Sequence, residues 1–175
     1  MNRLSGLASS VELSGLLNLL GLHVISEDFY VDLLNLIYGW KIRNANSLQQ
    51  NAPGIDLVDD SNRILVQVTG TSTKGKIDHS LKEIPEKYTG YHFYFAPIVI
   101  DAKEQRKYKY SPPHEVVFNP KTDILDIHFI ADKIKSMPAI EDIRTIAMFI
   151  KNNIQNDVPD TTQLTSGLNY IISQL

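Results

Sequence analysis

The sequence predicts an α/β domain in which a mixed sheet, containing an antiparallel hairpin, is flanked by helices. Helical patterns alternate along the chain with short runs rich in valine, isoleucine and leucine. Two of these runs are joined by a turn of about four residues, which can connect only adjacent antiparallel strands. A chain of 175 residues, 43% of them hydrophobic, can bury one sizeable core without disulfide bonds.

The composition excludes several classes of function. The chain has no cysteine, which rules out thiol catalysis, cysteine–zinc sites and disulfides and agrees with a cytoplasmic location. A formal net charge of −3 disfavours a protein that coats nucleic acid through bulk charge. No apolar run reaches about 18 residues, so we expect no membrane span.

The chain is expected to form one domain over residues 1–175. The opening "MNRLSGLASSVELSGLLNLLGL" superficially resembles a signal peptide, but Glu12 and Ser14 interrupt it and no small-residue cleavage site follows. Residues 1–22 are therefore predicted to be an N-terminal helix whose leucine stripe packs on the core or mediates oligomerisation. Residues 23–100 form the core, and residues 114–175 add a C-terminal strand and helices.

The core begins with a helix and the hairpin. Ser26 is a good helix N-cap, and Gly39 marks the expected end of that helix. The polar segment "NANSLQQNAPG" reads as a loop, followed by a strand from Ile55 and a second strand over residues 63–69. The turn between the two strands is "DDSN".

Further elements follow from the same patterns. "TSTKGKIDHSLKEIPEKY" predicts an N-capped helix that turns Ile77, Leu81 and Ile84 inward and ends near Pro85. "YHFYFAPIVI" predicts a largely buried strand, and "EVVF" a further one. Helices are expected around "LDIHFIADKIKSM" and "AIEDIRTIAMFIKNNI", and a short one in "TTQLTSGLNYIISQL".

One motif points to nucleotides. Residues 70–76 match the G-x-x-x-x-G-K part of a P-loop, and "IVID", ending at Asp101, resembles the strand that carries a second magnesium-binding acid. However, Ile77 stands where the magnesium-binding serine or threonine belongs. The strand before Gly70 is also the second arm of an antiparallel hairpin, whereas P-loops follow strands of mainly parallel sheets. We therefore disfavour an NTPase.

The hairpin itself carries a second pattern. Side chains at positions i and i+2 of a strand share a face, so Gln67 and Thr69 point to one side while Val66 and Val68 point to the core. The short turn brings Asp56 beside that polar side. The pattern fits a metal site of a nuclease, and it also fits an ordinary half-exposed strand.

The stretch from residue 23 to about residue 85 resembles the SMEK domain family of bacterial domains. The matching pieces, in order, are "SEDFY", "LLNL", "PGIDL", "VQVT" and the Lys76-Ile77 pair. These domains resemble the restriction-endonuclease-like fold of the PD-(D/E)xK nucleases, which include Mrr-like members in which glutamine replaces the acid of the triplet. The resemblance thus implies a restriction-endonuclease-like core.

The resemblance also implies site residues. Asp56 matches the aspartate of the first hairpin strand, Gln67 the glutamine variant, and Glu27 a helix glutamate that some members contribute. These three residues would bind Mg²⁺ or Mn²⁺. Thr69 departs from the pattern, which puts there a lysine that orients the attacking water and stabilises charge on the phosphate. Lys76, seven residues later, is the expected substitute, although a solvated lysine in a first helical turn is an equal alternative.

The expected function is metal-dependent hydrolysis of nucleic-acid phosphodiesters, DNA first, within a bacterial defence or restriction system. A basic, aromatic-rich segment supports a nucleic-acid partner, although charged loops are more often plain solvated surface. A homo-oligomer and a fused or associated defence component are the other expected partners. The alternative is an inactive nuclease-like fold that serves as a binding or oligomerisation module. The candidate nucleic-acid-binding residues are Lys74, Lys103, Arg106, Lys107 and Lys109.

Overall fold

The computed structural model describes residues 27–45 and 54–156, with side chains for residues 28–45 and 54–153. The predicted N-terminal helix over residues 1–22, the Ser26 cap and the predicted helix over residues 161–175 lie outside this part of the chain. Glu27 contributes its backbone to a helix, but its side chain also lies outside the described residues.

The described strands form one mixed sheet in the order β1-β2-β3-β4. The pairs β1–β2 and β2–β3 are antiparallel, as the predicted hairpin requires, whereas β3–β4 is parallel. The strands are β1 (Arg43–Asn44), β2 (Leu57–Asp59), β3 (Ile64–Thr69) and β4 (His92–Pro97). The predicted class, a mixed sheet with an antiparallel hairpin, is confirmed at this level.

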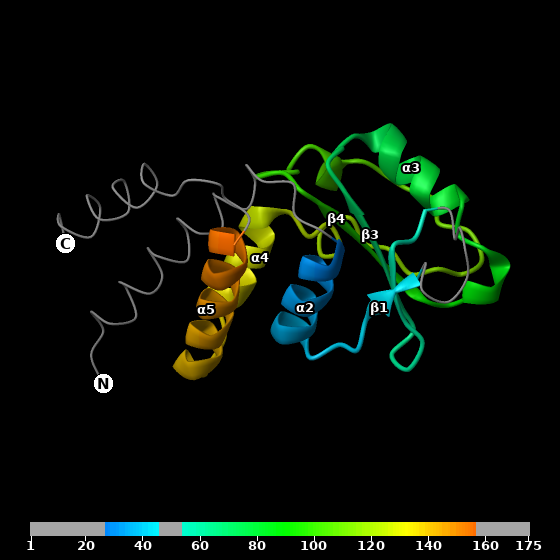
Figure 1. Cartoon of the computed structure of the whole chain (residues 1–175). Helices are drawn as coiled ribbons and strands as arrows, with labels where there is room; N and C mark the ends of the chain where they lie inside the picture. The colour runs from blue at the N-terminus through cyan, green and yellow to red at the C-terminus, as the bar shows by residue number, and fades with distance from the viewer. Residues whose placement is uncertain (1–26, 46–53, 157–175) are drawn as a thin grey trace.

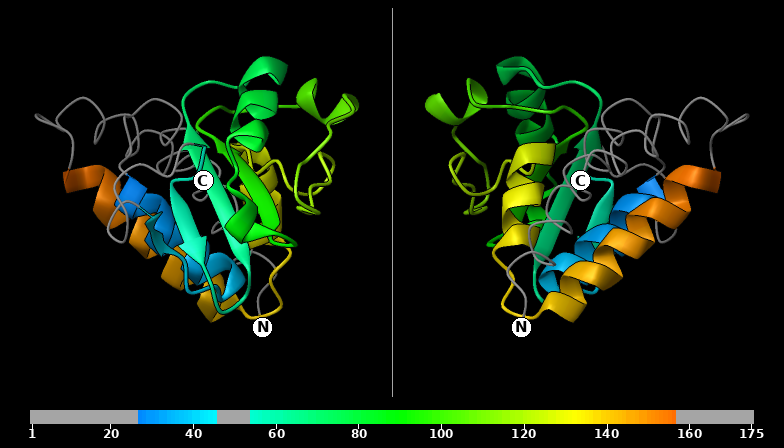
Figure 2. Two further views of the ribbon diagram at one scale, coloured as in Figure 1. Left: turned by 90° about the vertical axis from the view of Figure 1, so that its right-hand side faces the viewer. Right: turned by 90° about the vertical axis from the view of Figure 1, so that its left-hand side faces the viewer.

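Helices cover both faces of the sheet (Figure 1). α3 lies on one side, and the other helices lie on the opposite side, where α2 and α5 run next to each other (Figure 2). Within the described ranges, none of these helices has the length and apolarity that a membrane crossing requires. The helices are α2 (Glu27–Tyr38), α3 (Lys74–Lys82), α4 (Ile127–Lys135) and α5 (Ile140–Asn156), with short 3₁₀ turns η2 (Glu86–Tyr88) and η3 (Gln105–Lys107).

The central strand β3 is apolar along most of its length because both of its faces are buried. Ile64 and Val66 join a cluster formed with α2, α4 and α5. Leu65 points the other way and joins a second cluster under α3. Gln67 shares the face of Leu65 and is itself only 6% exposed. The side predicted to be polar therefore carries a core of its own, and Gln67 lies at the border of that core.

Two predicted helix ends are confirmed, and a third helix has an N-cap that was not predicted. Gly39 follows α2 with φ +68°, a left-handed conformation that glycine adopts without steric cost. The Thr73 hydroxyl caps α3 by accepting the Lys76 N–H at 3.1 Å. α4 starts at Asp126, whose carboxylate accepts the Phe129 N–H at 2.8 Å.

Several details differ from the sequence-based expectation. β2 starts at Leu57 and not at Ile55, and it includes Asp59, which was expected in the turn. β1 was expected to be part of a loop, and its two residues form a strand only by pairing with β2. β3 starts one residue later than predicted because Arg63 has φ +56°. The strand predicted over "EVVF" is reduced to an isolated bridge between Val117 and His92. His114, just before the predicted strand, and Glu115, its first residue, have φ of +53° and +55°, which breaks extended structure.

Candidate functional site

The hairpin register brings Asp56 and Gln67 together. The paired ladder of β2 and β3 ends with Leu57 opposite Val66. The Asp56 N–H donates to the carbonyl of the same Val66 at 3.0 Å, so Asp56 lies just beyond the ladder, next to the end of β3. Asp56 Oδ2 also accepts the Val68 N–H at 2.7 Å. The half-buried carboxylate is therefore fixed against the backbone of β3.

Gln67 contacts this carboxylate through its amide nitrogen. Nε2 donates to Asp56 Oδ2 and also to the Val68 carbonyl at 3.1 Å. These two acceptors determine the orientation of the amide, because its oxygen would repel both of them. The pair is thus a carboxylate and a carboxamide held side by side, with Gln67 Oε1 directed away from Asp56.

Gly54 fixes the approach of this segment to α3. It has φ +78°, and a Cβ at this position would lie 2.6 Å from the Ser80 carbonyl oxygen. Only glycine combines that conformation with that close packing. Gly54 therefore lies directly against α3 two residues before Asp56, and α3 is the helix that carries Lys76.

Of the two lysines in the first turn of α3, only one is already paired. Lys74 forms an ion pair with Asp78, and its Nζ lies 5.5 Å from the centre of the Tyr110 ring. Lys76 is half-buried and makes no ion pair with any residue in the described ranges. Of these two first-turn lysines, Lys76 is thus the one whose ammonium has no ion pair within the described ranges.

Thr69 occupies the position where the nuclease pattern places a lysine. Its hydroxyl accepts the Thr71 N–H at 3.2 Å, so the side chain serves the loop that leads to α3. The Glu27 side chain lies outside the described residues, and its predicted role stays a prediction. Among the described residues, no group of three His, Cys, Asp or Glu side chains is placed to hold a metal ion. Of the three residues predicted to bind a metal ion, only Asp56 and Gln67 have side chains within the described residues.

The basic segment after β4 is largely engaged with acids. Lys103 pairs with Asp101 and Lys107 with Glu104, each at 2.6 Å. Lys109 is exposed, and it has no ion pair within the part of the chain that the structure describes. The predicted contact of these lysines with nucleic acid stays a prediction.

Arg106 has a structural role that the sequence could not reveal. Its Nη1 lies 2.6 Å from Asp126 Oδ2, and its Nη2 donates to the Ile124 carbonyl at 2.8 Å. The Asp126 side chain is only 1% exposed and the Arg106 side chain 18%. The guanidinium therefore anchors the basic segment to the start of α4, twenty residues further along the chain.

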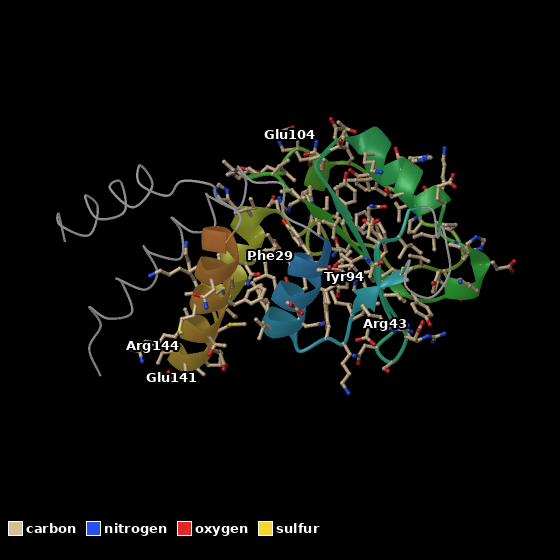
Figure 3. The ribbon with its side chains drawn as sticks, in the orientation of Figure 1. Phe29, Arg43, Tyr94, Glu104, Glu141 and Arg144 are labelled. Carbon is tan, nitrogen blue, oxygen red and sulfur yellow. The ribbon has the colours of Figure 1, made fainter. Side chains whose placement is uncertain are left out.

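A groove lies at the carboxyl ends of the parallel strands β3 and β4. It has a volume of about 490 Å³ and is lined by Ser72, Val99, Asp101, Lys103, Glu104 and Gln105. The Glu104 side chain lies at the end of the molecule where α3 begins, whereas Arg43 lies towards the opposite end (Figure 3). The groove borders two features of the disfavoured P-loop pattern, the glycine-containing loop before α3 and Asp101.

Comparison with known families identifies the chain. A family model described as the SMEK domain matches residues 1–135. The chain belongs to the SMEK domain family. The match includes the hairpin, α3 and the groove, and it extends well beyond the stretch that first resembled the family. No curated protein and no solved structure matches the chain.

Proposed function

We propose that this SMEK domain is a metal-dependent hydrolase of nucleic-acid phosphodiesters, with DNA as the preferred substrate, in a bacterial defence or restriction system. One observation carries the proposal: the contact between the Asp56 carboxylate and the Gln67 carboxamide across the hairpin. In the glutamine variant of the PD-(D/E)xK pattern, these are the two metal-binding positions of the hairpin. The order of hairpin, helix and parallel strand also agrees with a restriction-endonuclease-like core.

The donor set fits a hard divalent cation. Asp56, Gln67 and the predicted Glu27 would hold Mg²⁺ or Mn²⁺ through oxygen atoms, which both ions prefer. The ion, when bound, supplies Lewis acidity and a more acidic bound water. Gln67 must turn its amide so that Oε1 replaces Nε2 beside Asp56, which breaks the contact with the Val68 carbonyl. Lys76 would hold negative charge on the phosphate.

A second candidate function rests on two features of the same site. Thr69 stands in place of the lysine and is bonded to its own loop, and Gln67 presents nitrogen to Asp56. Both features suit a nuclease-like fold that has lost its chemistry and serves as a binding or oligomerisation module. The two functions differ in one measurable property, which is metal-dependent turnover.

Cleavage of supercoiled plasmid by the full chain, with Mg²⁺ or Mn²⁺, tests the proposal. We expect nicking that needs the metal and that falls by at least about tenfold in D56A and K76A, since each loses a charged contact to the ion or the phosphate. D60N is the matched control, because Asp60 lies in the same hairpin but pairs with Arg43 on the surface. Absence of cleavage under every metal condition, or equal cleavage by D56A, contradicts the hydrolase and supports the binding module.

A further inference from the structure

The turn between β2 and β3 carries an arginine in a backbone conformation that suits glycine. Arg63 has φ +56°, in the left-handed region, where the Cβ of any other residue is crowded. Glycine or asparagine would adopt this conformation at a lower cost. Strained residues cluster at binding and active sites, so the contacts of the Arg63 side chain are informative.

The Arg63 guanidinium is held in place without an acid. Its Cζ lies 5.5 Å from the centre of the Tyr91 ring, and its Nη2 donates to the Thr89 carbonyl at 3.4 Å. The Asp60 carboxylate, which accepts the Tyr91 hydroxyl at 3.3 Å, forms its ion pair with Arg43. Arg63 is exposed and has no ion pair with any residue that the structure describes. Its oriented positive charge is therefore available to a ligand.

Basic residues exceed acidic ones around this turn. Lys87 is exposed, and its Nζ lies 4.9 Å from the centre of the Tyr88 ring, which is 5.1 Å from the Tyr91 ring. We define the turn-end surface as Arg43, Arg63, Lys87 and Tyr91. The segments that meet here, residues 41–43, 59–63 and 86–91, carry the cations Lys41, Arg43, Arg63 and Lys87 and the acids Asp59, Asp60 and Glu86. Of these acids, Asp59 is buried and bonded to backbone N–H groups.

The turn-end surface lies on the same face of the sheet as Gln67. Arg43 pairs with Val58, whose side chain belongs to the cluster under α3, and residues paired across strands share a face. Tyr91 packs against the same cluster. Gln67 lies four residues after Arg63, which corresponds to about 13 Å along an extended strand. A DNA duplex rises about 3.4 Å per base pair, so about four base pairs span that distance.

We propose that the turn-end surface binds the phosphate backbone of nucleic acid, with Arg63 as the main contact. The planar fork of a guanidinium matches two phosphate oxygens, and the Tyr91 ring beneath it limits its motion. The inference rests on the proposed nucleic-acid substrate and adds a contact surface separate from the basic segment after β4. Contacts to phosphate position a duplex without reading its sequence.

Fluorescence anisotropy of a labelled DNA duplex, titrated with the full chain at several KCl concentrations in EDTA, tests this surface. EDTA removes divalent cations, so binding is measured independently of cleavage. We expect R63Q to weaken binding about fivefold or more at low salt and to lower the slope of log affinity against log salt by about 0.9. R63K should keep the slope but bind more weakly than the wild type, since an ammonium is not a planar fork.

R63N separates binding from folding. Asparagine tolerates the left-handed conformation, so the melting temperature of R63N should be no lower than that of the wild type, while its DNA affinity falls as in R63Q. R144Q is the matched control, because it removes one arginine charge from α5, where Arg144 pairs with Glu141 away from Arg43 (Figure 3). R144Q should bind DNA like the wild type.

Two results would overturn the proposal. The first is that folded R63Q and R63N bind DNA as tightly as the wild type. The second is that R144Q weakens binding as much as R63Q, which would mean that only net charge matters. A wild-type chain that binds no DNA would contradict both this surface and the proposed hydrolase. Binding that depends on Arg63, without cleavage under any metal condition, would contradict the hydrolase alone.

Discussion

At the scale of single residues, the amide of Gln67 determines what the candidate site can do with a cation. Its nitrogen donates to Asp56 and to the Val68 carbonyl, so the metal-free pair is electrostatically satisfied by itself. A glutamate in this place could not donate either hydrogen bond and would add a second negative charge beside Asp56. The glutamine therefore stabilises the hairpin without metal, and cation binding must compete with that stability.

Replacing Gln67 by glutamate should lower the stability of the metal-free protein and increase the stabilisation that a bound cation provides. Without metal, Q67E should unfold at a lower temperature, because it puts a second carboxylate where the Gln67 amide now contacts Asp56. With 10 mM Mn²⁺, an experimental condition chosen as roughly saturating, its melting temperature should rise by more than that of the wild type. Differential scanning calorimetry with and without Mn²⁺ measures both shifts.

The double variant D56N/Q67E is the control for this effect. It restores a single carboxylate and should respond to Mn²⁺ no more than the wild type does. A melting temperature of Q67E that does not depend on Mn²⁺ would contradict a cation site at Asp56.

Asp59 makes the stability of the fold depend on pH. Its side chain is buried and accepts hydrogen bonds from Lys41 N and from both nitrogens of Asn62. Burial raises the pKa of Asp59, but hydrogen bonds from Asn62, Lys41 and Ser61 outweigh burial and leave the pKa below its ordinary value. A carboxylate with a lowered folded-state pKa stabilises the fold above its unfolded pKa of about 3.9, and that stabilisation is lost as the pH falls through the folded value.

We therefore expect the cost of D59N to depend on pH. At pH 7 the amide cannot accept all of these hydrogen bonds, and unfolding should become easier by roughly 1–3 kcal/mol. The difference from the wild type should shrink at about pH 3 or below, where Asp59 itself becomes protonated. Urea unfolding at both pH values measures the difference in unfolding free energy between D59N and the wild type, with D60N as the exposed control. A difference of the same size at both pH values would show that ionised Asp59 is not the cause.

At the scale of elements, what the sequence could predict was local. The helix after Thr73 follows from an expected N-cap and apolar spacing, and a helix was expected around "LDIHFIADKIKSM"; both helices are confirmed, whereas the Asp126 cap was not predicted. The contact of Asp56 with Gln67 was predictable because a tight turn fixes the register. β1 was not predictable, since two residues carry no period, and neither was the parallel pairing of β4, which depends on a crossover through α3.

Side-chain partners far apart in the sequence escaped prediction for the same reason. Arg106 appeared as one more cation in a basic loop, yet its partner Asp126 is a helix cap. The amide orientation of Gln67 depends on the Val68 carbonyl, which no sequence pattern reports. Such contacts are set by tertiary geometry, so they decide which predicted residues remain available to a ligand.

Arg106 should therefore act on stability more than on binding. R106A leaves the Asp126 carboxylate buried without its charge partner, and we expect a loss of about 3 kcal/mol, the low end for a buried pair because the guanidinium is partly exposed. R106K should recover only part of this, since an ammonium cannot bridge Asp126 and the Ile124 carbonyl in the same planar geometry. Guanidinium-induced unfolding measures both losses.

The control for R106A is K107A, which removes a surface pair with Glu104. Its cost should stay below about 1 kcal/mol. If R106A is as stable as K107A, the basic segment is not anchored to α4 through this ion pair.

At the scale of the whole molecule, the net charge and the local pairing of lysines limit how the protein can hold nucleic acid. The formal charge is −3, and three of the candidate lysines are neutralised by neighbouring acids. Long-range attraction to a polyanion is therefore weak, and affinity must come from the few cations that remain unpaired. Of the lysines proposed to contact phosphate, Lys109 is exposed and unpaired within the described residues, and Lys76 is unpaired but half-buried.

Lys109 should consequently contribute more to DNA affinity than Lys107, although both lie in the same segment. Both substitutions remove one positive charge. Lys107, however, is already paired with Glu104, so less of its charge is available to a phosphate than that of Lys109. If Lys109 contacts one phosphate, K109Q should lower the slope of log affinity against log salt by about 0.9. Fluorescence anisotropy of a labelled duplex, titrated at several KCl concentrations, measures this slope. Equal slopes for the wild type, K109Q and K107Q would show that neither lysine contacts the DNA. Lys76, which has no ion pair among the described residues, would then be the next lysine to test.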